Sequence, residues 1–117
     1  MMKVEVPFGF YKSVALDIAD KIQQQGSIDE LVAVSRGGLV LASIIARRLK
    51  TDVGYFLPSS QQLVLNNSGS KNIVFIEDLI ATGKTLENIK QVMDQHEKIN
   101  WFCVPFEAKQ PDTMDAA

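Results

Sequence analysis

The sequence predicts one α/β domain spanning residues 1–117, with a mostly parallel twisted sheet and helices on both faces. Two observations lead to this prediction. Short, fully apolar runs of the kind that strands buried on both faces require alternate with segments that repeat apolar residues at helical spacing. Turn-forming residues separate these segments into successive strand–helix–strand units, and such units place neighbouring strands in parallel.

The first half of the chain contains two predicted helices and two predicted strands. Tyr11–Gln25 repeats apolar side chains at helical spacing and is followed by Gly26, which suits the end of a helix. The apolar run Leu31–Val34 is a predicted buried strand, and Leu39–Lys50 is a predicted, mostly buried helix. Asp52–Leu57 is the second predicted strand.

The second half begins with a polar stretch of about residues 58–71, rich in Ser, Asn and Gly, which is predicted to be a flexible loop. Asn72–Ile76 is the most strand-like segment of the chain, and Lys84–His96 repeats apolar residues at helical spacing. Trp101–Phe106 is one more predicted strand. Hydrophobicity falls after it, and residues from about 110 to 117 are predicted to form a tail.

The composition restricts the classes of function. The net charge is −2 with both signs interspersed, which argues against nucleic acid and anionic membrane as partners and favours small-molecule chemistry. The single cysteine, Cys103, excludes an intrachain disulfide and a cysteine metal cluster, and its apolar surroundings predict a buried thiol. No signal peptide or membrane-spanning run is recognised, so a cytoplasmic protein is expected, and a homodimer would suit its modest core.

One segment, residues 73–85, joins a buried strand, two adjacent carboxylates, a turn and the start of a helix. Backbone N–H groups at a helix amino terminus and nearby hydroxyl groups favour a phosphate. Glu77 and Asp78 suit the vicinal hydroxyls of a ribose, and a magnesium ion can share them. The segment therefore predicts a sugar-phosphate site, and its expected phosphate-binding residues are Ala81, Thr82, Gly83, Lys84 and Thr85.

The tripeptide Gly83-Lys84-Thr85 invites comparison with the P-loop of nucleotide triphosphatases. That motif needs a glycine at the position that Asp78 occupies, and two carboxylates beside the loop would repel a polyphosphate. The P-loop interpretation therefore fails.

A second turn, formed by Ser35, Arg36, Gly37 and Gly38, also follows a predicted strand and precedes a predicted helix. The glycines expose backbone N–H groups, and Arg36 supplies a forked donor for phosphate oxygens. Ligands of parallel sheets bind outside the carboxyl ends of the strands, so both turns are expected at the same edge.

The apolar strand, acid pair and Thr-Gly-x-Thr order of residues 73–85 resembles the phosphoribosyl pyrophosphate signature of the type I phosphoribosyltransferases. Ser35–Gly38 resembles the pyrophosphate loop of the same family, nearest in pattern to its xanthine and guanine-hypoxanthine branch. The resemblance covers about residues 11–109. It implies a type I phosphoribosyltransferase-like core and a magnesium-dependent reaction of nucleotide salvage. In that reaction the phosphoribosyl group of phosphoribosyl pyrophosphate (PRPP) passes to a nitrogenous base, with a purine expected, and pyrophosphate is released.

The resemblance also implies a role for each part of the site. Glu77 and Asp78 would lie near the ribose and stabilise a transition state of oxocarbenium character, with Asp78 the candidate magnesium ligand. Ala81–Thr85 would bind the 5′-phosphate, and Ser35–Gly38 the pyrophosphate. The partners implied are PRPP and a nucleobase or nucleoside monophosphate.

Three departures from the family pattern bear on activity. No Lys or Arg occurs in residues 51–70, where family members bring basic residues over the pyrophosphate. Ala81 stands where many purine-salvage members have a proton-accepting aspartate, so no general base is identified. Lys109 and Ile80 are the candidates for contacting the base, but the chain ends eight residues after Lys109, and the hood that stacks on the base is expected to be absent.

Two functions remain open from the sequence. The first is a small phosphoribosyltransferase, and the second is a catalytically inactive or regulatory module that binds PRPP or a nucleotide. The acid pair and the two phosphate-binding turns predict ligand binding in both cases, whereas the missing lid cation and hood favour the module.

Overall fold

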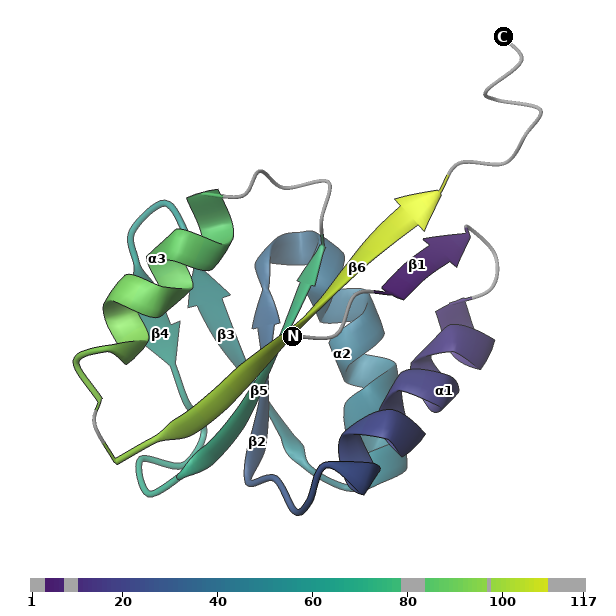
Figure 1. The fold of residues 1–117 in the computed structure, drawn as a ribbon, viewed down its shortest axis with the longest axis horizontal. Coiled ribbons are helices and arrows are strands. Elements are labelled where there is room, and N and C mark those ends of the chain that lie inside the picture. The colour runs from purple at the N-terminus through teal and green to yellow at the C-terminus, as the bar shows by residue number, and fades with distance from the viewer. Residues whose placement is uncertain (1–3, 8–10, 79–83, 97, 110–117) are drawn as a thin grey trace, which may run out of the picture.

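The structure is a computed structural model that describes residues 4–7, 11–78, 84–96 and 98–109, with only the main chain described for residues 4–7, 11, 36, 78, 84 and 105–109. The described residues form six strands and three helices (Figure 1). Their order is β1 (Val4–Pro7), α1 (Tyr11–Gln24), β2 (Glu30–Val34), α2 (Ser35–Leu49), β3 (Asp52–Leu57), β4 (Gln62–Val64), β5 (Asn72–Asp78), α3 (Lys84–Met93) and β6 (Asn100–Lys109).

All six strands belong to one sheet with the order β1-β6-β5-β2-β3-β4. Strand β4 runs antiparallel to β3, and the other neighbouring strands are parallel. Helices α1 and α2 cover one face of the sheet and α3 covers the other (Figure 1). The predicted α/β class, with a mostly parallel sheet and helices on both faces, is confirmed.

The core consists of two apolar layers, one on each face of the central strands. In β2, Leu31 and Ala33 pack towards α1 and α2, whereas Val32 and Val34 pack towards α3. A strand that contributes to both layers must be apolar at every position, which is why this run lacks the alternation of a half-exposed strand. Phe75 of β5 extends the α3 layer through an edge-to-face contact with Trp101, with ring centroids 5.7 Å apart.

The predicted elements are present, although only β3 has the predicted bounds, and two further strands were not predicted. Helix α2 begins at Ser35 rather than at Leu39, so the predicted turn is the first turn of the helix. Strand β6 continues to Lys109, three residues beyond the predicted end at Phe106. The sequence did not predict β1 or β4, because strands of four and three residues are too short to show a period.

The stretch of residues 58–71, predicted as a flexible loop, contains β4 and a turn that is bonded to a buried carboxylate. The Glu30 side chain is fully buried and accepts hydrogen bonds from the N–H groups of Asn66 at 2.8 Å and Asn67 at 3.3 Å, and from Ser70 Oγ at 3.1 Å. A Cβ added at Gly54 would lie 2.6 Å from Glu30 Oε2, so only glycine leaves room for this carboxylate. The flexibility of the stretch stays a prediction.

No helix among the described residues has the length and apolar character needed to cross a membrane.

Candidate functional site

The two predicted phosphate-binding segments begin at neighbouring points on one edge of the sheet. Val34, the last residue of β2, is in register with Glu77 of the adjacent parallel strand β5. The chain enters α2 directly after Val34, and it leaves β5 directly after Asp78. The parallel register therefore brings the first turn of α2 beside the acid pair, at the carboxyl edge where α/β sheets bind ligands.

The first turn of α2 consists of Ser35–Gly38 and has two unusual features. Ser35 adopts a left-handed conformation with φ of 59°, which is uncommon for a residue other than glycine. Val34 is the N-cap residue and makes no side-chain capping hydrogen bond. A helix start with strained backbone and no side-chain cap presents its N–H groups and its positive dipole end to an anion.

Gly38 allows this turn to pack against β5 at main-chain distance. A Cβ built on Gly38 would collide with the carbonyl oxygen of Ile76. Ile76 immediately precedes Glu77, so the contact holds the start of α2 close to the strand that carries the acid pair. The sequence predicted that the glycines of this turn expose backbone N–H groups, and it missed this packing role of Gly38.

Glu77 is buried, with 2% of its surface exposed, and it lies on the α3 side of the sheet beside Cys103. The Cys103 thiol donates a hydrogen bond to Glu77 Oε2, with a sulfur–oxygen distance of 3.5 Å. Burial, followed by the nearby Glu77 carboxylate, raises the pKa of Cys103 far above its ordinary value, so the thiol keeps its proton. Cys103 was predicted to be buried, which is confirmed, but its contact with the acid pair was not foreseen.

The other predicted site residues are described to different extents. Thr85 lies in the first turn of α3 and is buried, with 5% of its surface exposed. The main chain of Arg36 is part of the first turn of α2, Lys84 begins α3, and Asp78 ends β5. The residues that lie outside the described part of the chain are Ile80, Ala81, Thr82 and Gly83.

Lys109 lies on the same edge of the sheet as the acid pair. Phe106 of β6 is in register with Asp78, and Lys109 comes three positions later in the same strand. Because a strand rises about 3.3 Å per residue, the main chain of Lys109 lies about 10 Å beyond the end of β5. Figure 1 shows the end of β6 extending past the neighbouring β5.

Comparison with solved structures identifies the same fold in phosphoribosyltransferases. The xanthine-guanine-hypoxanthine phosphoribosyltransferase of Helicobacter pylori matches with a TM-score of 0.65 and 14% identity, over 97% of this chain and 94% of that chain. A purine phosphoribosyltransferase from Pyrococcus horikoshii matches with a TM-score of 0.62 and 18% identity, over 96% of this chain and 89% of that chain. At these identities the likeness concerns the fold.

Two curated proteins are similar in sequence. The transcriptional regulator GfcR 2 of Methanosarcina barkeri is 30% identical over 112 residues, which cover 86% of this chain and 54% of that protein. The transcriptional regulator GfcR of Methanosarcina mazei is 30% identical over 100 residues, covering 74% of this chain and 49% of that protein. The chain thus spans about half the length of the curated relatives it matches.

The family is shown by a match along most of the chain. The family model described as the phosphoribosyl transferase domain matches residues 10–104. This range contains both predicted phosphate-binding segments, the acid pair, strands β2 to β5 and the first half of β6. The chain therefore belongs to the phosphoribosyl transferase domain family, with the type I fold expected from its sequence.

Proposed function

We propose that this protein binds PRPP at the carboxyl edge of β2 and β5 and transfers its phosphoribosyl group to a purine base, releasing pyrophosphate. The observation that carries the proposal is the register of Val34 with Glu77, which joins the uncapped start of α2 to the acid pair. An anion-binding helix start beside two carboxylates suits a ligand with phosphates at its ends and a diol between them.

Each part of the site has a role in the proposed reaction. The bond from the anomeric carbon to the pyrophosphate breaks, and a bond from that carbon to a nitrogen of the base forms. Pyrophosphate leaves towards Arg36 and the N–H groups of the first turn of α2, which stabilise its charge. Glu77 and Asp78 stabilise the positive charge that develops on the ribose, and the burial of Glu77 strengthens its field. Residues 81–85 hold the 5′-phosphate.

Magnesium fits the proposed chemistry through the donors present. When bound, it would neutralise charge on the departing pyrophosphate. Asp78 would hold it, because carboxylate oxygens are ligands that Mg²⁺ prefers.

The proposed base-binding residues are Lys109 and Ile80. The position of Lys109 at the end of β6, on the edge that carries the acid pair, supports this assignment. A lysine at this place can donate to an exocyclic oxygen of a purine. The structural neighbour from Helicobacter pylori is named for xanthine, guanine and hypoxanthine, which are bases with such an oxygen.

A second candidate function is a regulatory module that binds PRPP or a nucleotide without turnover. The observation that favours it is that both similar curated proteins are named transcriptional regulators. The absence of Lys and Arg from residues 51–70 points the same way, because a catalytic lid would need a cation over the pyrophosphate. The proposed ligand site is the same for both functions.

The deciding experiment is a calorimetric titration of the protein with PRPP and Mg²⁺, followed by addition of adenine, guanine, hypoxanthine, xanthine and orotate with a pyrophosphate assay. Binding followed by pyrophosphate release would support the transferase and identify its base. Binding without release for any base would support the regulatory module, and no PRPP binding would overturn both. The variant Asp78→Asn should keep the fold and weaken PRPP binding about tenfold, because one acceptor for the diol becomes an amide.

A further inference from the structure

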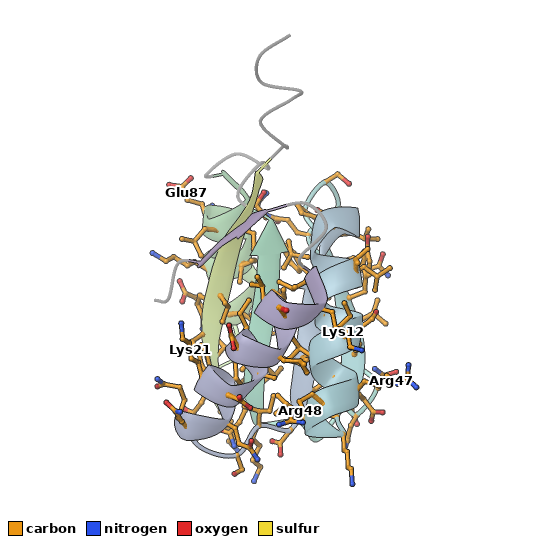
Figure 2. All side chains as sticks on the ribbon, turned by 90° about the vertical axis from the view of Figure 1, so that its right-hand side faces the viewer. Lys12, Lys21, Arg47, Arg48 and Glu87 are labelled. Atoms are coloured by element: carbon orange, nitrogen blue, oxygen red, sulfur yellow. The ribbon has the colours of Figure 1, made fainter. Side chains whose placement is uncertain are left out.

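A groove lies between α1 and α2, on the outer surface of the helical layer that they form. The groove is open to solvent and has a volume of about 640 Å³; it is lined by Lys12 and Leu16 of α1 and by Ser43, Ile44, Arg47 and Arg48 of α2. Leu16 and Ile44 are half-buried and form its apolar floor, whereas the three cationic side chains are exposed. Figure 2 shows Lys12, Arg47 and Arg48 gathered on this face of the molecule.

The positive charge of the groove is not matched by a lining carboxylate. The ion pair described nearby joins Arg48 Nη2 to Asp20 Oδ1 at 3.8 Å, with 56% and 54% of the two side chains exposed. Exposed ion pairs of this kind contribute little free energy, so a stronger anionic partner can compete with Asp20 for Arg48. The groove is thus a local cationic site on a chain whose net charge is −2.

Helix stability explains two of these cations but not the third. Arg47 and Arg48 lie in the last turn of α2, where positive charge complements the helix dipole. Lys12 lies in the first turn of α1, where the dipole favours an acidic residue and none is present. Helix stability therefore gives no reason for a cation at position 12, which leaves Lys12 available to an anionic group outside the chain.

The apolar floor distinguishes between classes of anionic partner. A nucleic-acid backbone is recognised by cations and hydrogen-bond donors, and it would gain nothing from Leu16 and Ile44. A helix with one apolar ridge flanked by carboxylates complements both the floor and the rim, in the manner of a helix bound in a groove. Charge and apolar character together therefore favour an acidic protein segment.

We propose that the groove between α1 and α2 binds an acidic amphipathic helix of a partner protein. The apolar ridge of this helix packs on Leu16 and Ile44, and its carboxylates pair with Lys12, Arg47 and Arg48. The groove is separate from the carboxyl edge of the sheet, so the proposal does not depend on the ligand bound there. Helix α2 belongs to both places, because its first turn lies beside Glu77 and its last turns line the groove.

The test uses the whole chain and a fluorescent synthetic peptide of about 16 residues, long enough to form a helix, with leucines at helical spacing and flanking glutamates. Fluorescence anisotropy is expected to show binding that weakens with salt. Lys12→Glu should weaken it about tenfold, because an attraction becomes a repulsion. A matched peptide with lysines in place of the glutamates should not bind.

Lys21→Glu is the control, because it makes the same change of charge in α1 at a residue outside the groove, on the other flank of the helix (Figure 2). The helix dipole predicts that Lys12→Glu keeps or raises the melting temperature, whereas Lys21→Glu, in the last turn, lowers it slightly. Lys12→Glu should therefore lose binding without losing stability, and Lys21→Glu should keep binding despite a small loss of stability. That pair of results would establish the groove as the binding site.

Three results would overturn the proposal. One is equal binding of the acidic peptide by the wild type and Lys12→Glu. Another is equal binding of the acidic and lysine peptides. The third is failure of the acidic peptide to bind while duplex DNA binds in a Lys12-dependent manner, which would assign the groove to nucleic acid.

Discussion

Cys103 donates a hydrogen bond from its thiol to Glu77 Oε2, across the neighbouring strands β6 and β5 and within the layer that α3 covers. Both side chains are buried, and Glu77 belongs to the proposed ribose site. A thiol whose pKa is raised by burial stays a donor at all physiological pH values. Cys103 is therefore placed to orient one of the two carboxylates.

Replacing Cys103 should separate this orienting role from simple packing. Cys103→Ala removes the donor and is expected to cost about 1 kcal/mol of stability and to weaken PRPP binding severalfold. Cys103→Ser keeps a donor of similar size and should retain more of the PRPP affinity. Urea denaturation and calorimetry measure the two effects. Equal PRPP affinity in the alanine and serine variants would contradict the role.

Gly38→Ala should disturb the start of α2. The added methyl group would collide with the Ile76 carbonyl, so α2 must move away from β5 at a cost of about 1–3 kcal/mol. Pyrophosphate affinity, measured by calorimetry, should fall as well, because the first turn shifts relative to the acid pair. Gly69→Ala is the matched control, since its added Cβ would meet a movable side-chain atom, Asn67 Oδ1, at 3.3 Å. Similar unfolding free energies for the two variants would refute the close-packing argument.

Arg36→Ala tests the proposed pyrophosphate site. Loss of a forked, charged donor is expected to weaken pyrophosphate binding about tenfold or more. Binding of a nucleoside monophosphate should change less, because its phosphate is assigned to residues 81–85. Calorimetric titration with each ligand gives the comparison. An equal loss for both ligands would remove Arg36 from the pyrophosphate site.

Glu30→Gln should loosen the edge of the sheet near β4. The buried carboxylate accepts bonds from Asn66, Asn67 and Ser70, and an amide turns one of its acceptor oxygens into a donor. We expect a loss of about 1–3 kcal/mol in urea denaturation and faster amide exchange in residues 65–70. Asp52→Asn, at the exposed position in register with Glu30, should stay within about 0.5 kcal/mol of the wild type. Unchanged exchange would show that Glu30 does not hold the turn.

Asp29 should contribute to the acid dependence of stability. Its pKa is lowered from 3.8 by hydrogen bonds from the backbone N–H groups of Lys71 and then Asn72. A depressed pKa means that the unfolded chain binds the proton more readily, so the contribution is complete above about pH 3.8 and is lost as the pH falls through the folded pKa. Asp29→Asn should flatten the dependence of the unfolding free energy on pH below about 4. The same slope in wild type and variant would exclude this contribution.

Much of the fold could be predicted because the signals are local. Strand β3 has the predicted bounds, Asp52–Leu57, and α1 differs from its prediction by one residue at the end. Helical spacing and apolar runs reflect which side chains must be buried, and that requirement acts within a few residues. The residue types of the site could also be predicted from local sequence, because the acid pair and the glycine-containing turns are short motifs.

What the sequence by itself determined was the α/β class, the order of the main elements and the residue types of a sugar-phosphate site. Only the tertiary structure decided that Ser35–Gly38 is helical, that β1 forms a strand, and that Glu77 lies buried beside Cys103. Each of these depends on a partner distant in the sequence: Gly38 packs on Ile76, β1 pairs with the end of β6, and Cys103 meets Glu77 through the β5–β6 register. Such contacts exist only after the sheet has assembled, so a period or motif read along the chain carries no signal of them.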